Sequence, residues 1–324
     1  MSGARRLVVA IAAAGILAGL PATAGASIAY SRSGAIMVAD DAGQNARRVG
    51  FGRAPVISPD GTRIALLRRG ADGGLALILL GVADGGEVAT GVRCAPRQIA
   101  WAPDSTRLAC VVARSGVSVV GVDGAERVLA KPGRGGTGRP AWSPDSTRVV
   151  WSTSGTLHWR AADGRGPVRT IGAGWGPEWG PRLVAFERGG YTADNLYRGS
   201  VWTVDPARGT NSVASFGNRS VTTCATGPLF VYGWTPDGTG VVVGGDDRQT
   251  CESFAAVIVG AKLRVLGEEY VPAEFRAIAA DGAAALLETD EGACAAPLDR
   301  AGCTPLIAGA TNVTATAGWR YPTG

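Results

Sequence analysis

The chain repeats one phrase four times: SPDGTRIALL at residues 58–67, APDSTRLACV at 102–111, SPDSTRVVWS at 143–152 and TPDGTGVVVG at 235–244. Each copy is a Pro-Asp turn followed by a short run of aliphatic or β-branched residues, and three copies have Trp directly before them. Self-similarity at a period of roughly 40 residues is typical of repeat architectures in which every unit is one supersecondary structure. Because the residues after each turn are strand formers, the phrase predicts an all-β fold.

A second short turn recurs in the same units, as Ala-Asp-Gly or Val-Asp-Gly at residues 83–85, 122–124 and 162–164. Each unit is therefore predicted to be four strands joined by a Pro-Asp turn, a longer loop and an Asp-Gly turn, with segments of ordinary strand length. This order puts both short turns at one face and the longer loops at the other. Loops that differ between units are common binding sites, so the longer-loop face is the expected binding face.

The number of units follows from two degenerate copies and from the chain ends. The degenerate copies are Trp-Gly-Pro at 179–181 and Asp-Gly at 281–282. Near the C-terminus, Trp319 matches the position of Trp101, but the chain ends before the next strand, and residues 27–31 resemble that missing strand. We therefore predict a seven-bladed β-propeller closed by pairing of the segment at about 312–319 with the N-terminal strands, which leaves no long open edge. If one degenerate copy is an insertion, the ring has six blades.

The N-terminus has the pattern of a secretory signal. Arg5 and Arg6 are followed by an unbroken apolar run at residues 7–20 and then by small residues. The run is short for a membrane span, and no other stretch is long and apolar enough to cross a bilayer. We expect residues 1–26 to be a signal peptide and residues 27–324 to form a single propeller domain that is secreted or extracytoplasmic.

Six cysteines follow the signal, an even number in a chain predicted to be exported, which indicates disulfides. Their spacing favours three local pairs, Cys94 with Cys110, Cys224 with Cys251 and Cys294 with Cys303, although fifteen pairings are possible. A Cys-rich metal site is not expected, because the chain has no C-x-x-C and a single histidine, His158. No cofactor is expected either.

The formal net charge is +5 and falls by two when Arg5 and Arg6 leave with the signal. Nearly all basic residues are arginines, and they are scattered through predicted strands and turns. Nucleic-acid binding requires a concentrated basic stripe, so a nucleic-acid partner is not expected.

The repeated Asp and Trp residues have an architectural explanation. Asp60, Asp104, Asp145 and Asp237 could present a ring of carboxylates, but Asp after Pro commonly accepts a hydrogen bond from the backbone two residues on. Because every regular unit shares this position, we expect the four residues to form turns. For the same reason we expect the repeated Trp residues to fill the space between adjacent blades, with the indole N–H donating to a polar group.

These residues resemble the Pro-Asp signature repeats of TolB-like proteins, a WD-repeat-like family of propellers. The family pattern is an aromatic residue, Ser-Pro-Asp-Gly, a small polar residue, a basic residue and an apolar strand, and the matches lie at 58–63, 101–107, 142–148 and 234–238. The resemblance spans essentially the whole chain after the signal and implies an extracytoplasmic, protein-binding propeller. TolB has an α/β domain ahead of its propeller, whereas here the signal leads directly into the first strand, so the resemblance does not extend to a role in the Tol–Pal system.

Four of the longer loops stand out, at 131–139 (KPGRGGTGR, basic and Gly-rich), 187–198, 217–228 and 244–253, and two of them carry the candidate binding residues. The loop at 187–198 (ERGGYTADNLYR) has Tyr and Arg side chains of the kind that anchor interfaces, although its tyrosines could instead pack on their own blade. The loop at 244–253 (GGDDRQTCES) would be joined to the loop at 217–228 by a Cys224–Cys251 disulfide, which lowers the entropy lost on binding. The candidate residues are Tyr191, Asp194, Asn195, Tyr197, Arg198, Asp246, Asp247 and Arg248.

Two functions are compatible with this sequence. The first is a non-catalytic, monomeric binding module whose partner is a protein or an envelope polymer. The alternative is a propeller enzyme of the lactonase or lyase type with a metal in the central channel. The acids of the Asp-Gly turns sit at strand ends, and His158 lies in the strand TLHWR beside Trp159, where a packed or surface role is expected. The binding module is therefore the preferred prediction, with no catalytic and no metal-binding residues.

Overall fold

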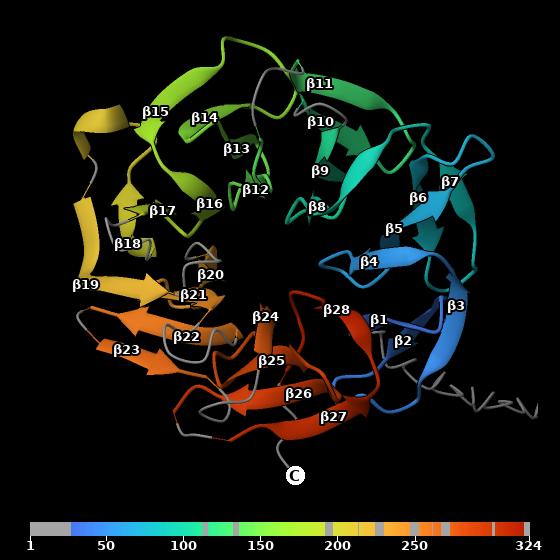
Figure 1. Cartoon of the computed structure of the whole chain (residues 1–324). Coiled ribbons are helices and arrows are strands. Elements are labelled where there is room, and N and C mark those ends of the chain that lie inside the picture. Colours follow the sequence, from blue (N-terminus) through green and yellow to red (C-terminus); the bar gives the residue numbers. More distant parts are fainter. Residues whose placement is uncertain are drawn as a thin grey trace, which may run out of the picture.

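The structure is a computed structural model that describes residues 27–112, 116–131, 136–191, 197–212, 214–223, 230–246, 253–260, 262–266, 273–299 and 302–320. Seven four-stranded antiparallel sheets are arranged as blades around a central axis (Figure 1). The all-β, seven-bladed propeller predicted from the repeats is therefore confirmed, and the six-bladed alternative is wrong.

Each blade runs from an innermost strand at the axis to an outermost strand at the rim. In that order, blade 1 has β28 (Thr311–Ala315), β1 (Ile28–Arg32), β2 (Ala35–Ala39) and β3 (Arg47–Phe51). Blade 2 has β4 (Arg53–Ile57), β5 (Arg63–Arg69), β6 (Leu75–Gly81) and β7 (Glu87–Ala89). Blade 3 has β8 (Cys94–Trp101), β9 (Arg107–Val112), β10 (Gly116–Gly121) and β11 (Glu126–Ala130). Blade 4 has β12 (Ala141–Trp142), β13 (Arg148–Thr153), β14 (Thr156–Ala161) and β15 (Arg169–Ala173).

The remaining blades follow the same order. Blade 5 has β16 (Trp175–Trp179), β17 (Val184–Tyr191), β18 (Tyr197–Val204) and β19 (Ala214–Thr223), with the short 3-10 helix η2 (Gly209–Ser212) before β19. Blade 6 has β20 (Phe230–Trp234), β21 (Gly240–Asp246), β22 (Ser253–Val259) and β23 (Lys262–Val265). Blade 7 has β24 (Ala273–Ile278), β25 (Ala284–Thr289), β26 (Gly292–Pro297) and β27 (Thr304–Ala308).

The ring closes within blade 1, where the last strand of the chain pairs with the first. Ile28 of β1 lies opposite Ala315 of β28, and the Thr311 hydroxyl donates to the Ser31 carbonyl oxygen at 3.2 Å. In Figure 1 the two ends of the colour scale meet in this blade. The predicted closure by N- and C-terminal strands is confirmed.

The prediction that Trp319 occupies the position of Trp101 is wrong. The amide of Ala102, directly after Trp101, donates to the carbonyl of Arg107, the first residue of the next strand. The amide of Thr316 donates in the same way to the carbonyl of Ser27, directly before β1, at 2.8 Å. Ala315 therefore stands at the position of Trp101, and Trp319 lies beyond the strand. The reason is that pairing with β1, and not the local sequence, sets the register of β28.

Trp319 instead joins blade 1 to blade 7. Its side chain is fully buried, its indole Nε1 donates to the Asp41 carbonyl at 3.0 Å, and its own carbonyl accepts the Ala280 amide at 2.8 Å. Asp41 lies in the turn after β2, and Ala280 lies in the first turn of blade 7. One residue thus connects two turns at the closing point of the ring.

The repeated Asp residues form the turns, as predicted. The Asp145 carboxylate accepts hydrogen bonds from the Ser143 hydroxyl at 2.5 Å and from the Thr147 amide at 3.0 Å. These hydrogen bonds lower the pKa of Asp145 to about 2, with the Ser143 hydroxyl making the largest contribution. The other three members accept a hydrogen bond from the amide two residues on in the same way: Asp60, Asp104 and Asp237.

The Trp and Ser residues of the phrase connect neighbouring blades. Each repeated indole donates to a carbonyl of the preceding inner strand, from Trp101 to Val56 at 2.8 Å, from Trp142 to Ala100 at 2.9 Å, and from Trp234 to Glu178 at 3.1 Å. The predicted role of the Trp N–H groups is confirmed.

Ser105 and Ser146 take the turn position that glycine holds in other copies, both at a φ of 59°. The Ser146 hydroxyl accepts the Asp104 amide of the previous blade at 3.0 Å, and the Ser105 hydroxyl accepts the Asp60 amide at 3.1 Å. These bonds explain why serine is found at a backbone conformation that favours glycine.

The hydrophobic core is divided into layers between adjacent blades. One layer joins Ile36 and Val38 of blade 1 to Ile64 and Leu66 of blade 2, and further layers follow around the ring. Burial of these aliphatic side chains is the main force that holds neighbouring blades together. Among the described residues, no helix is long and apolar enough to span a membrane.

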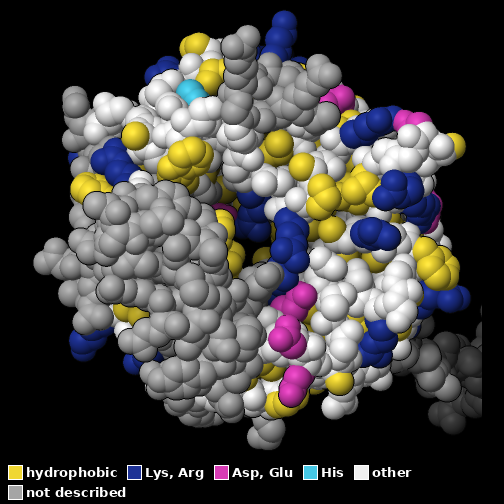
Figure 2. All heavy atoms as spheres, viewed as in Figure 1, with side chains coloured by type: hydrophobic (Ala, Val, Ile, Leu, Met, Phe, Trp, Pro, Cys, Tyr) yellow, Lys and Arg dark blue, Asp and Glu magenta, His cyan; other side chains and the backbone are white. Residues whose placement is uncertain are grey.

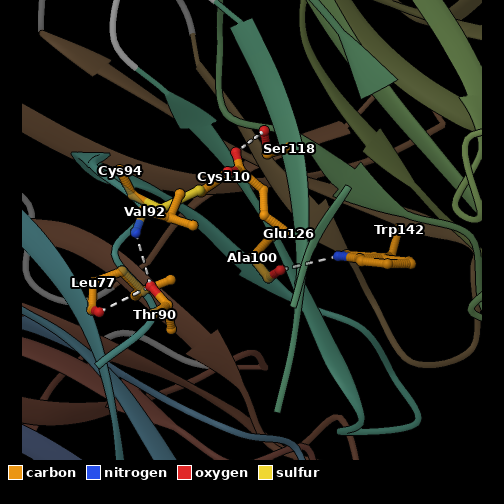
Figure 3. The surroundings of a disulfide bond; sticks show 9 residues. All are labelled: Leu77, Thr90, Val92, Cys94, Ala100, Cys110, Ser118, Glu126 and Trp142. Atoms are coloured by element: carbon orange, nitrogen blue, oxygen red, sulfur yellow. Dashed lines mark hydrogen bonds between the residues drawn. A yellow bond between two sulfur atoms is a disulfide. The ribbon is translucent and has the colours of Figure 1, made fainter. Parts of the chain in front are cut away.

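Two of the three predicted disulfides lie in the described residues, and both are confirmed. Cys94 bonds to Cys110 between β8 and β9 of blade 3, and Cys294 bonds to Cys303 in blade 7. Figure 3 shows the Cys94–Cys110 disulfide inside blade 3. The third predicted pair, Cys224 and Cys251, lies outside the described residues.

A candidate ligand site in the central channel

A cavity of about 810 Å³ lies at the centre of the ring and is lined by residues of all seven blades. In the space-filling view the molecule is hollowed at this point, with basic side chains at one side of the opening and hydrophobic side chains at another (Figure 2). The cavity results from the architecture, because the innermost strands of seven blades cannot approach the axis closely enough to fill it. Their sequences therefore decide its chemistry.

Blades 3, 4 and 5 supply the polar part of the wall, here called the polar arc. Its members are Arg97 and Gln98 of β8, Arg139 before β12, Ser152 of β13 and Glu178 of β16. Guanidinium groups are pure donors, carboxylates are pure acceptors, and amide and hydroxyl groups are both. The polar arc can therefore satisfy a ligand that donates and accepts within a short distance.

An ion pair holds the polar arc together across two blades. Arg139 Nη2 lies 2.5 Å from Glu178 Oε1, and the Glu178 side chain is only 15% exposed. Burial raises the pKa of Glu178 above its ordinary value, while the Arg139 guanidinium acts in the opposite direction. The charge of Glu178 raises the pKa of Arg139, which therefore stays protonated. A second carboxylate, that of Glu187 on β17, lines the cavity on the same blade and is buried.

A second ion pair fixes the opposite side of the wall. Arg276 of β24 lies 2.8 Å from the Glu288 carboxylate. The two carboxylate oxygens of Glu288 also accept the backbone amides of Asn312 and Val313, at 3.0 and 2.9 Å. Glu288 therefore holds both Arg276 and the closing strand β28 in place at the channel.

Blades 5, 6 and 7 supply four aromatic side chains, here called the aromatic arc: Trp175, Phe230, Tyr232 and Phe275. The ring centroids of Phe230 and Tyr232 are 6.3 Å apart, and those of Tyr232 and Phe275 are 5.6 Å apart. Trp175 and Phe230 are 45% and 47% exposed, which is unusual for such large side chains. Exposed aromatic surface that faces a cavity is a typical ligand contact.

The inner strands bulge where they line the cavity. The pairing register shifts in β4, β8 and β16, and the left-handed residues at or near these shifts are Ala54 (φ 49°), Arg97 (φ 60°) and Gly176 (φ 50°). Asn312 of β28 has a φ of 50° as well. Positive φ is unfavourable for Ala and Arg, and such strain is concentrated at functional sites. Bulges also redirect side chains, here towards the axis.

The Cys94–Cys110 disulfide secures the largest of these bulges. In the ladder between β8 and β9, Cys94 lies opposite Val112 and the next pair is Ile99 with Cys110. The intervening residues 95–98 leave the ladder and bring Arg97 and Gln98 to the cavity wall. The disulfide joins the two sides of this irregular stretch and so restricts the position of Arg97.

The binding residues predicted from the loops are only partly within the described structure. Tyr191 and Tyr197 end β17 and begin β18 and lie directly opposite each other, and Arg198 lies opposite Gly190. Asp246 ends β21, opposite Ser253. Since Gly189 and Gly190 line the cavity, the β17–β18 hairpin reaches the channel. The other four predicted residues lie outside the described residues: Asp194, Asn195, Asp247 and Arg248.

Sequence reasoning singled out the loops at 131–139 and 187–198, which contain Arg139 and Glu187, but it placed neither residue at the channel and did not identify Glu178. Arg139 ends the segment KPGRGGTGR, which carries no recognised binding motif, and Glu178 lies in the degenerate copy of blade 5. Their departure from the repeat pattern is the one signal in the sequence that could have indicated a functional role for Arg139 and Glu178. Within the described residues, no three His, Cys, Asp or Glu side chains lie close enough to hold a metal ion. His158 packs beside Trp151 and lies 3.2 Å from the Thr170 hydroxyl, as expected for a packed strand residue.

No protein-family model and no curated protein sequence matches the chain. Among solved structures, the tricorn protease is similar with a TM-score of 0.63 and 11% identity, over 85% of this chain and 32% of that one. Oligogalacturonate lyase from Vibrio parahaemolyticus is similar with a TM-score of 0.60 and 12% identity, over 88% and 87% of the two chains. TolB from Acinetobacter baumannii matches with a TM-score of 0.47 and 14% identity, over 76% and 67%.

The chain spans about a third of the length of the tricorn protease chain that it matches. At identities of this size, the likeness to the protease and the lyase shows the propeller fold alone.

Proposed function

We propose that this protein is an extracytoplasmic, non-catalytic binding module that takes a protein or an envelope polymer into the mouth of its central channel. The observation that carries this proposal is the cavity of about 810 Å³ with a polar arc on one side and an aromatic arc on the other. Ligand sites in proteins are concave, of about 300 to 1,000 Å³, and combine apolar walls with a few placed polar groups. The predicted signal peptide and the two disulfides support the extracytoplasmic location.

The channel is suited to binding because its walls are held in place. The Arg139–Glu178 pair and the Arg276–Glu288 pair join neighbouring structural elements, and the bulged strand β8 is tied down by a disulfide. A preorganised wall loses little conformational entropy when a ligand arrives. This property favours a binding surface that needs no rearrangement.

The test is co-sedimentation of the purified protein with isolated cell envelopes of the source cells. We expect the protein to be retained, and we expect Trp175→Ala combined with Tyr232→Ala to reduce retention at least tenfold, because both rings line the channel. The control is Phe51→Ala, which removes an exposed aromatic ring from the outer strand of blade 1 and should leave retention unchanged. Absence of retention, or equal retention by the double variant, would contradict the proposal.

A second candidate is an enzyme of the propeller lyase type, favoured by two carboxylates in the channel. Burial raises the pKa of Glu178, and Glu187 lies on the same blade; acids of this kind are common in active sites. A structurally similar oligogalacturonate lyase was determined in complex with manganese. The test is an assay for unsaturated products from oligogalacturonate, with and without added manganese, compared with Glu178→Gln. Turnover that Glu178→Gln abolishes would favour the enzyme over the binding module.

A further inference from the structure

Two polar atoms on the channel wall need a partner that the described residues do not supply. Ser152 is 1% exposed and Gln98 is partly buried, and both line the cavity. Among the described residues, neither the Ser152 hydroxyl oxygen nor the Gln98 Oε1 atom has a hydrogen-bond partner. Buried polar atoms are almost always satisfied, so their position on the wall indicates a ligand with hydrogen-bonding groups.

Gly138 lets the buried Ser152 hydroxyl pack directly against the segment that precedes β12. A Cβ atom at Gly138 would lie 2.7 Å from Ser152 Oγ, closer than two such atoms can approach. Gly138 has an ordinary negative φ, so the absence of a side chain is not required by backbone conformation. Its benefit is that the Ser152 hydroxyl can lie against the residue directly before Arg139, which a side chain at this position would prevent.

The aromatic arc and the polar arc together define the chemistry of the occupant. The occupant must offer flat apolar faces to rings such as Phe230 and Tyr232. It must also offer groups that both donate and accept, because Arg139 and Glu178 place a donor and an acceptor 2.5 Å apart. A pyranose ring has both properties, since its C–H faces are apolar and flat while its edge carries adjacent hydroxyls.

The inner strands are poorly suited to an extended peptide. A peptide that adds to a sheet edge needs a regular row of backbone N–H and C=O groups. The bulges with Ala54, Arg97 and Gly176 interrupt that row at the cavity wall. A sugar chain is recognised by side chains and stacking and does not need a continuous backbone ladder.

We propose that the central channel binds a linear oligosaccharide of pyranose units, with its ring faces on the aromatic arc and its hydroxyls on the polar arc. This proposal rests on the proposed binding function and names the class of envelope polymer. Trp175 and Tyr232 supply stacking surfaces, the Arg139–Glu178 pair contacts vicinal hydroxyls, and Ser152 reaches one further hydroxyl.

The test is calorimetric titration of the purified protein with chitohexaose, maltohexaose and hexagalacturonate, and separately with an acidic hexapeptide. We expect at least one of the three sugars to bind with a dissociation constant below about 1 mM. Comparison of the three distinguishes amino sugars, neutral glucans and uronates as the source of the shared chemistry. The peptide should not bind.

Two variants connect binding to the channel. Gly138→Ala places a methyl group against Ser152 Oγ and should weaken sugar binding at least tenfold. The control is Gly136→Ala, where a Cβ meets no heavy atom within 4 Å among the described residues and sugar binding should be unchanged. Trp175→Ala should also weaken binding at least tenfold, and its exposed ring makes it independent of any folding defect in Gly138→Ala. Near-ultraviolet circular dichroism confirms that each variant is folded.

Three results would overturn the proposal: no binding of any of the three sugars by the folded protein, binding of the peptide alone, or sugar binding that Gly138→Ala and Trp175→Ala leave intact. If envelope retention depends on the channel but no sugar binds, the carbohydrate proposal fails and the binding function stands. If retention is also absent, both fail.

Discussion

Trp319→Ala tests whether the ring is held closed by a single residue near the C-terminus. The indole is fully buried in the layer between blade 7 and blade 1 and donates to the Asp41 carbonyl at 3.0 Å. The backbone carbonyl of Trp319 accepts the Ala280 amide at 2.8 Å. The substitution removes the ring and leaves the Asp41 carbonyl without this donor. The backbone bond to Ala280 remains possible.

The expected cost follows from burial. Replacing a fully buried Trp by Ala typically lowers the free energy of unfolding by about 3 to 5 kcal/mol, which includes the cavity left behind. The lost hydrogen bond to Asp41 accounts for about 1 kcal/mol of that cost. Since folded proteins are stable by only about 5 to 15 kcal/mol, the variant should be close to the limit of stability. Trp319→Phe, which keeps most of the ring but loses the donor, should cost about 1 to 2 kcal/mol.

The assay is equilibrium urea unfolding, followed by fluorescence and by far-ultraviolet circular dichroism. The matched control is Trp175→Ala, because Trp175 is 45% exposed and its removal should cost about half as much as that of a fully buried Trp, roughly 2 kcal/mol. The free energy of unfolding should be lowest for Trp319→Ala, with Trp175→Ala and Trp319→Phe between it and the wild type. If Trp319→Ala unfolds within about 1 kcal/mol of the wild type, Trp319 does not hold the ring closed and the reasoning is refuted.

Two further predictions concern the turns and the disulfide. The Asp145 pKa is lowered to about 2 by hydrogen bonds from Ser143 and Thr147, so its contribution is present above the unfolded pKa near 3.8 and is lost as the pH falls towards 2. Asp145→Asn should therefore remove about 1 kcal/mol of the stability that the wild type loses between pH 4 and pH 2, after allowance for the exposure of Asp145. The prediction is refuted if the free energy of unfolding in urea changes with pH equally in both proteins across that range. Replacing Cys94 and Cys110 together by Ala opens a loop with a sequence separation of 16 and should lower the free energy of unfolding by about 3 kcal/mol in oxidised protein. Reduction of the wild type also breaks Cys294–Cys303 and should lower the stability at least as much; equal stability with and without reductant would count against the prediction.

The fold could be predicted from the sequence because its signals are local and repeated. Asp145 and its counterparts form turns through contacts within five residues, and the Trp residues connect neighbouring units in the same way each time. The Cys94–Cys110 pair follows from its short separation. The distant pairing of the N- and C-terminal strands is predicted correctly, but its register is not: Trp319 resembles Trp101 locally, whereas the register of β28 is set by β1 at the other end of the chain.

The candidate site is largely hidden from the sequence for the same reason. Arg139 and Glu178 are 39 residues apart, and only the curvature of the ring brings their side chains together. The bulges that turn Arg97 and its neighbours towards the axis leave no clear mark on the sequence, because they arise from mismatch between neighbouring strands. The sequence pattern puts Glu187 at the start of a loop, whereas β17 continues past it and its side chain is buried.

The pairing of β28 with β1 also determines the order in which the protein can be completed during synthesis. Ala29 and Thr314 contact each other although they are 285 positions apart in the chain. The first strand to be synthesised therefore cannot pair with β28 until nearly the whole chain has been made. Contacts of this range slow folding, and until they form, β1 presents an edge that other chains can pair with. The first blade to begin is therefore the last to be finished, and a nascent chain interrupted a few residues early carries an open sheet edge instead of a sealed ring.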